Sequence, residues 1–249
     1  MFLPEALTIE GLDVPLRRTG VLVIGSGAAA LACAVHLRRM GLRDLILATD
    51  NLLGGTSRNT GSDKQTYYRL GDSDRLPDSP YDMAESYLAG GAMHGDIALA
   101  EAQGSLRAFY NLVSIGVPFP HNRYGGYTGY KTDHDPRRRG TSLGPYTSRV
   151  MVERFHSEAL RLGVEILDRH DAVRLLTAPG SGGARAIGAL FLEKRGSAGQ
   201  SMGFRLVLAD HVVLGTGGPA GFYAASAYPR AHSGSIGLAL EIGAEAANL

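Results

Sequence analysis

The amino-acid sequence predicts an α/β fold of the doubly wound type, in which strands and helices alternate around a largely parallel sheet. Three observations lead to this prediction. The apolar run Val21–Ile24 passes through a glycine-containing turn into a helix of small residues. The apolar run Leu45–Ala48 follows about 20 residues after the turn, as a second parallel strand would. Beyond residue 160, short apolar runs alternate with Gly/Ser turns, which is the pattern of a β-meander.

The turn after the first strand has the pattern Gly-x-Gly-x-x-Ala over residues 25–30. Gly25 permits a tight turn, Gly27 lets the backbone approach a pyrophosphate, and Ala30 is small enough for the helix to pack closely on the strand. Ser26 and Ala28 complete the turn, and the free N–H groups of the first helical turn face the phosphates. We therefore predict a dinucleotide-binding turn. The alternative is that its glycines serve only a tight strand-to-helix connection.

The composition restricts the class of protein. With 249 residues and a formal net charge of +1, the chain lacks the broad basic face that nucleic-acid binding requires. Its single cysteine excludes a disulfide framework, and the scattered histidines predict no metal site. The sequence has no apolar run of about 18 residues, so we predict no membrane span. Its N-terminus lacks a basic segment followed by an apolar core, so we predict a cytoplasmic protein.

The remaining pattern predicts the order of the elements. Helices are expected between residues 80 and 116 and over 148–162, with an irregular segment over 118–145. Strands are expected over 164–167, 172–177, 186–194, 204–209 and 211–214, before a last helix at 238–242. We divide the chain into an N-terminal extension, 1–19, and a single domain, 20–249, with an inserted helical and loop segment at about 63–146.

Taken together, these motifs resemble the FAD-binding half of the fumarate reductase and succinate dehydrogenase flavoprotein family. The resemblance rests on residues 25–30, on Gly54-Gly55, on the strand and turn 213–218, and on the helical segment 237–244. It implies a glutathione-reductase-like Rossmann domain that binds FAD. It also implies a flavin-dependent oxidoreductase that transfers hydride between flavin N5 and a small substrate, either carboxylate-bearing or enone-like.

The resemblance assigns cofactor roles to particular residues. Gly25, Ser26, Gly27 and Ala30 would hold the FAD pyrophosphate beside Ala28, and the backbone of Val173 would face the adenine. The residues expected along the ribityl chain and the isoalloxazine are Gly54, Gly55, Thr56 and Ser57. The residues expected to let the chain pass close to the cofactor are Thr216, Gly217 and Gly218.

The sequence also departs from the family pattern. Ala48 stands where the family has an acid for the adenosine ribose, and Asp50 could replace that acid only if the loop bends back. Residues 56–62 contain no histidine for covalent attachment, so we expect noncovalent FAD. The family's substrate-binding residues follow the position of Leu249. We therefore expect the chain to be an N-terminal part, inactive alone, that a C-terminal half or a partner chain completes.

Within the chain, the segment 131–139 offers weak catalytic candidates. His134 lies between two aspartates and could act as an acid or base, and Arg137 and Arg138 could clamp a carboxylate. The alternative is a solvated loop with local Asp–Arg pairs. Two other functions also stay open from the sequence: an NAD(P)-dependent dehydrogenase, and a noncatalytic flavin-binding or assembly module that needs a second chain.

Overall fold

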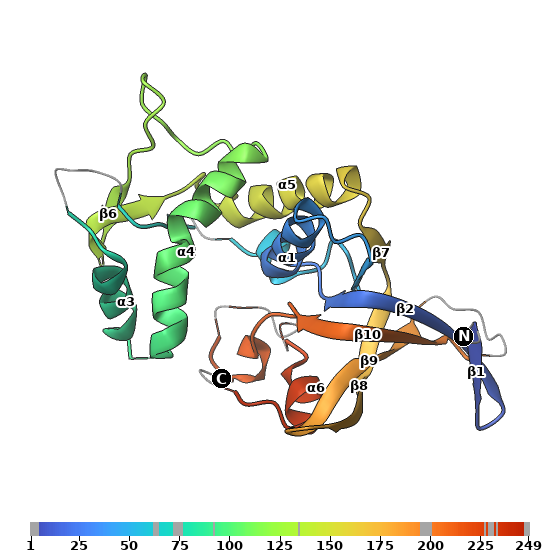
Figure 1. Cartoon of the computed structure of the whole chain (residues 1–249). Coiled ribbons are helices and arrows are strands. Elements are labelled where there is room, and N and C mark those ends of the chain that lie inside the picture. Colours follow the sequence, from blue (N-terminus) through green and yellow to red (C-terminus); the bar gives the residue numbers. More distant parts are fainter. Residues whose placement is uncertain are drawn as a thin grey trace. The chain divides into compact units, whose positions relative to one another are not determined.

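The computed structural model describes residues 5–61, 65–71, 77–91, 93–133, 135–194, 201–226, 228, 232 and 234–246. The chain forms two units (Figure 1). The first contains the residues up to Asn59 and Phe155–Glu245, and the second contains Thr60–Arg154. The predicted inserted segment, residues 63–146, lies within the second unit.

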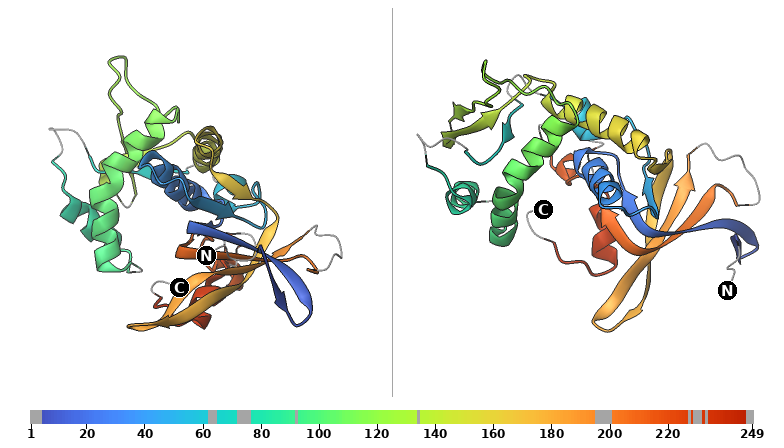
Figure 2. Two further views of the ribbon diagram at one scale, coloured as in Figure 1. Left: turned by 45° about the vertical axis from the view of Figure 1, so that its right-hand side comes forward. Right: turned by 45° about the horizontal axis from the view of Figure 1, so that its top comes forward.

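The first unit is built on a seven-stranded sheet with the order β7-β3-β2-β10-β9-β8 and with β1 paired to β2. Strands β7, β3, β2 and β10 run parallel, whereas β10, β9 and β8 form an antiparallel meander. In both views of Figure 2, β8 and β9 form a long hairpin. This arrangement confirms the predicted α/β fold with a β-meander. The strands are β1 (Ala6–Ile9), β2 (Leu12–Ile24), β3 (Leu45–Ala48), β7 (Glu165–Leu167), β8 (His170–Gly180), β9 (Gly183–Glu193) and β10 (Phe204–Leu214).

Two strands are longer than the sequence predicts. Strand β2 begins at Leu12, inside the predicted N-terminal extension, and Val14 and Leu16 are buried there. Strand β10 is continuous, although two separate runs were predicted. Exposed polar residues hide this continuity, because Asp210 and His211 interrupt the apolar pattern of β10 while its backbone pairing continues.

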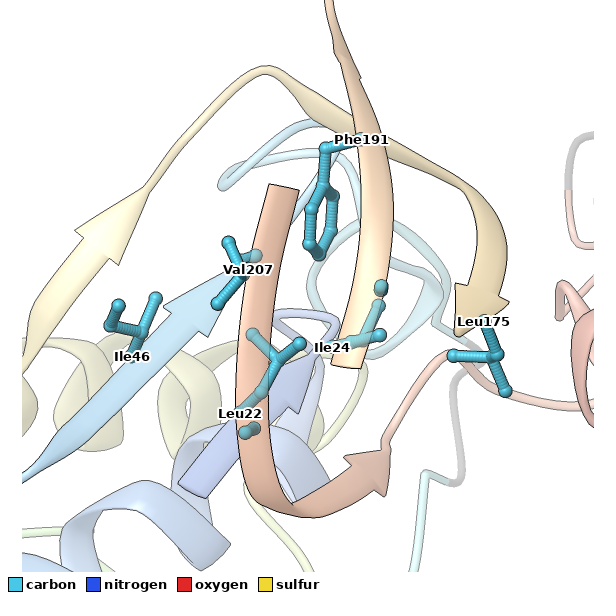
Figure 3. Close-up of a cluster of buried hydrophobic side chains, with 9 residues drawn as sticks. Leu22, Ile24, Ile46, Leu175, Phe191 and Val207 are labelled. Carbon is cyan, nitrogen blue, oxygen red and sulfur yellow. The ribbon is translucent and has the colours of Figure 1, made fainter. Parts of the chain in front are cut away.

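The core of the first unit lies between the parallel strands and the meander. Leu22, Ile24 and Ile46 of the parallel strands pack there against Leu175, Phe191 and Val207 (Figure 3). Val23 and Leu47, on the other face of the same strands, are also fully buried. Helix α1 (Ala28–Arg39) contacts both β2 and β3. Burial on both faces explains why these strands read as continuous apolar runs.

An ion-pair network joins α1 to the helix α5 (Thr147–Arg161). The buried carboxylate of Glu158 accepts a hydrogen bond from Arg161 at 2.6 Å and another from Arg39 of α1 at 2.8 Å. Hydrogen bonds from these two guanidinium groups lower the pKa of Glu158 from 4.5 to about 2, with Arg161 contributing most. The network therefore stabilises the ionised carboxylate where the two helices meet.

The last helix, α6 (Ile236–Glu241), packs on β8 (Figure 1). Leu238 and Ile242 contact the core of the first unit, and Arg174 pairs with Glu241 at 3.3 Å. The sequence predicts this helix with nearly the same bounds. It follows Ser235, which has φ +50°.

In the second unit, two helices pack through small residues. Met83 and Ala84 of α3 (Pro80–Leu88) are buried with Ala98 and Ala102 of α4 (Gly95–Ser114). These are the helices predicted between residues 80 and 116. Across the described ranges of the whole chain, the helices all fall short of the length or apolarity that crossing a bilayer demands.

The second unit also contains a three-stranded sheet where the sequence predicts an irregular segment. Strand β6 (Asp135–Thr141) pairs with β4 (Tyr67–Tyr68) and with β5 (Tyr130–Thr132). The buried residues of β6 include two charged ones. The guanidinium of Arg139, 2% exposed, lies 2.5 Å from the buried carboxylate of Asp78 and 3.4 Å from that of Asp135. The prediction of an irregular segment is wrong where β5 and β6 form, because β6 buries an ion pair, which leaves no apolar alternation to find, whereas residues 118–129 form no helix or strand.

Candidate cofactor site

Three parallel strands of the first unit end at one edge of the sheet. In the register, Ile24 of β2 lies opposite both Ala48 of β3 and Leu214 of β10. The chain leaves these ends through three turns, at residues 25–27, 49–55 and 215–218. Because open α/β sheets bind ligands outside the carboxyl ends of their strands, this edge is the candidate site.

The turns after β2 and β10 pack backbone against backbone. Gly25 has φ +114°, and a Cβ at this position would lie 2.4 Å from the carbonyl oxygen of Gly215. A Cβ on Gly215 would in turn lie 2.6 Å from the Cβ of Ala30. The fold itself therefore requires small residues at Gly25, Gly215 and Ala30, independently of any ligand.

Gly27 and Gly55 are different, because they lie close together and a Cβ on either one would meet its neighbours only at ordinary contact distances. The backbone at Gly27 has φ −72°, which any residue adopts, and a Cβ there would meet only Ser57 Oγ, at 3.4 Å. A Cβ on Gly55 would come no closer than 3.8 Å to the backbone of Gly27. Nothing in the fold requires these two glycines. The space that their missing side chains leave fits a ligand that approaches the backbone.

This space adjoins the N-terminus of α1. Gly27 is the N-cap residue, and the helix has neither a capping side chain nor an acidic residue in its first turn. The N–H of Ala28 donates a long hydrogen bond, 3.4 Å, to Ser57 Oγ. A helix start with its partial positive charge and few partners for its N–H groups suits a phosphate group.

The loop after β3 begins with buried hydroxyl groups. Ser26 Oγ lies 3.0 Å from Thr49 Oγ1 and also donates to backbone carbonyls of the loop, so its side chain ties the two turns together. Ala48 is fully buried. Asp50 lies on the surface after it, and its carboxylate pairs with Lys194 at 3.0 Å. Asp50 is therefore the acid nearest the end of β3 in sequence, and it already has a cationic partner.

The remaining glycine turns meet through a histidine that the sequence did not single out as a site residue. Thr56 Oγ1 hydrogen-bonds His232 Nδ1, and the N–H of Gly218 donates to His232 Nε2 at 3.1 Å. Gly217 has φ +84°, and a Cβ there would lie 3.3 Å from the same nitrogen. Thr216 Oγ1 donates to the carbonyl of Gly234. The only signal in the sequence is the place of His232 just before the last helix.

Val173 lies at an irregularity in the meander. The register of β8 and β9 pairs Ala172 with Phe191 and Arg174 with Leu190, which leaves Val173 as an extra residue, a β-bulge. Its side chain is 40% exposed. The start of β8 also lies close to the end of β3, because the His170 N–H donates to the Thr49 carbonyl at 2.9 Å.

The weak catalytic candidates lie in the second unit. Arg137 pairs with Asp82 at 3.2 Å and donates to the Pro77 carbonyl, whereas Arg138 is exposed with φ +58°. His134 lies outside the described residues. Over the part of the chain that the structure describes, no group of three or more His, Cys, Asp or Glu side chains could hold a metal ion.

Two curated relatives match most of this chain. L-aspartate oxidase of Streptomyces coelicolor is 29% identical over 240 residues, which cover 92% of this chain and 38% of the relative. L-aspartate oxidase of Agrobacterium fabrum is 27% identical over 233 residues, which cover 92% of this chain and 41% of the relative. The chain thus spans about two fifths of the length of these relatives.

Solved structures share the fold. A quinol-fumarate reductase with menaquinol molecules superposes with a TM-score of 0.76 at 16% identity, over 92% of this chain and 38% of that one. A family model described as FAD binding domain matches residues 20–249. That match takes in every strand end and glycine turn of the candidate site, so the chain belongs to the FAD binding domain family.

Proposed function

We propose that this chain is the FAD-binding part of a flavin-dependent oxidoreductase and that it holds FAD without a covalent bond. The observation that carries the proposal is that Gly27 and Gly55, which lie close together at the N-terminus of α1, have room for a Cβ and are not required as glycines by the fold. FAD supplies hydride transfer at flavin N5, and the chain's task is to bind and orient it. The matching family and the oxidase relatives support this function.

Each turn of the site has a role in this proposal. The backbone N–H groups at the start of α1, with Gly25, Ser26 and Gly27 before them, would hold the pyrophosphate. Gly54, Gly55, Thr56 and Ser57 would bind along the ribityl chain and isoalloxazine, and Thr216, Gly217 and Gly218 would let the chain pass close to the cofactor. The bulge at Val173 supports the proposed contact with adenine, because its backbone is released from regular pairing. Asp50 would bind the ribose hydroxyls while it keeps its ion pair with Lys194.

The substrate is a further part of the proposal. We infer a small, carboxylate-bearing substrate, since the curated relatives are named L-aspartate oxidases. We propose that residues outside these 249, in a following segment or in a partner chain, complete the substrate site, because the relatives are much longer. Arg137 and Arg138 stay weak candidates for substrate contact. A cytoplasmic location stays a prediction from composition.

A titration of the purified chain with FAD tests the proposal. Gly27→Val places two methyl groups beside the N-terminus of α1, so we expect FAD affinity to fall by about 100-fold, or roughly 2.7 kcal/mol, as the phosphate loses backbone hydrogen bonds. Gly95→Val is the matched control, because Gly95 also lies at the start of a helix with no atom within 4 Å of its virtual Cβ. Equal affinities in the two variants would contradict the proposed site.

The attachment of FAD has its own measurement. After acid precipitation, noncovalent flavin stays in the supernatant, where its fluorescence is read. Flavin that remains with the pellet would overturn the noncovalent part of the proposal and leave the site itself standing.

A further inference from the structure

We propose that His232 is a positioning residue that connects the two loops on either side of the turn at residues 25–27, an inference that rests on the proposed FAD site. We call this connection, made by the two hydrogen bonds of the His232 ring, the clasp. The imidazole contacts the loop after β3 through Thr56 and the loop after β10 through Gly218. Strands β3 and β10 flank the carboxyl end of β2, which carries the Gly25–Gly27 turn. One side chain therefore connects the two loops that flank this turn.

The hydrogen bonds fix the form of the imidazole. Because the Gly218 N–H donates to Nε2 at 3.1 Å, Nε2 carries a lone pair. In a neutral ring the proton is then on Nδ1, which donates to Thr56 Oγ1. Both ring nitrogens are thus used, one as acceptor and one as donor, and the ring cannot turn over without losing both bonds.

The surrounding contacts hold the histidine in place. Its carbonyl accepts from the Gly221 N–H at 2.7 Å, and its ring packs on Tyr228 with centroids 5.1 Å apart. The glycine at 217 gives the ring room, since a Cβ there would lie 3.3 Å from Nε2. A side chain anchored in this way can restrain the loop at Thr56.

The clasp matters for FAD because of what lies next to Thr56. Gly55, its chain neighbour, is separated from Gly27 by little more than the space of one missing side chain, because a Cβ on Gly55 would lie 3.8 Å from the Gly27 backbone. Ser57 accepts a hydrogen bond from the N–H of Ala28. A shift of Thr56 would therefore change the width of that space. We infer that His232 sets this width and that it acts through the loops without any need to touch the cofactor itself.

The test measures the FAD dissociation constant and, without FAD, the melting temperature of single and double variants. Thr56→Val removes the hydroxyl at one end of the clasp. His232→Asn keeps an amide near Nδ1 but loses the acceptor for Gly218. Each should weaken FAD binding about tenfold, which is the worth of one such hydrogen bond. Because the two bonds act in series, the double variant should bind no more weakly than either single one.

Two controls separate the clasp from a general loss of structure. Thr56→Ser keeps the hydroxyl and should rescue binding, whereas His211→Ala removes an exposed histidine of β10 and should leave binding unchanged. Dissociation constants within twofold of the wild type in both clasp variants would overturn the proposal. So would a roughly 100-fold effect in the double variant, since that shows two independent contacts. A wild-type chain that binds no FAD would instead overturn the proposed function first.

Discussion

Replacing Gly215 by alanine tests whether the site is built on direct packing of the β10 turn against α1. The new Cβ would lie 2.6 Å from the Cβ of Ala30 and 3.0 Å from its Cα, whereas carbon atoms prefer about 3.5–4.0 Å. The turn and the helix must therefore move apart by about 1 Å. Overpacking of this kind costs about 1–3 kcal/mol, and the entropy that alanine removes from the unfolded chain offsets about 0.4–1 kcal/mol.

The net destabilisation of Gly215→Ala should be about 1–2 kcal/mol, which for a chain of this size lowers the melting temperature by about 2–8 °C. Thermal unfolding followed by circular dichroism measures it. Gly182→Ala is the matched control, because no atom lies within 4 Å of its virtual Cβ and its φ is not positive. A Gly215→Ala protein that melts within 1 °C of the control would refute the packing of these backbones.

The remaining predictions concern buried charges. Glu158→Gln should lower the free energy of unfolding by about 2 kcal/mol, measured by urea unfolding at pH 7. The control Glu153→Gln removes a carboxylate from an exposed ion pair and should cost less than about 0.5 kcal/mol. Because the folded-state pKa of Glu158 is about 2, below its ordinary 4.5, its contribution is complete above about pH 5 and is lost as the pH falls toward 2. The difference in unfolding free energy between wild type and Glu158→Gln should therefore be smaller at pH 3 than at pH 7. A difference that stays constant between these pH values would contradict this. Asp78→Asn leaves the buried guanidinium of Arg139 without its main charge partner and should cost about 3–5 kcal/mol, whereas Asp82→Asn in an exposed pair should cost less than about 1.

The sequence is most informative where local rules decide the structure. The strand at 21–24, the glycine turn and the helix of small residues follow each other within about 20 residues, and each has the periodicity or turn chemistry of its element. The helices of the second unit follow the same logic, since Met83, Ala84, Ala98 and Ala102 lie on buried faces. The continuous apolar runs of β2 and β3 also predict strands that are buried on both faces.

Contacts between distant residues explain what the sequence does not reveal. Arg139 pairs with Asp78, which lies 61 residues earlier in the sequence, and this ion pair allows a charged segment to form a buried strand. Thr56 and His232 are 176 residues apart, so no local pattern connects them. The bulge at Val173 arises from the pairing between β8 and β9, so no local sequence pattern predicts it.

Strand β10 shows why the site depends on both parts of the first unit. Its first half, from Phe204 to Leu208, pairs antiparallel with β9, and the segment from Leu206 to Leu214 pairs parallel with β2. The meander and the parallel sheet therefore share one strand, and the turn at 215–218 leaves that strand directly. Because β2 ends beside it in register, the distance between the two turns is set by backbone pairing. Only the loop after β3 lacks this direct link to β10, and that is the loop that His232 connects to the turn.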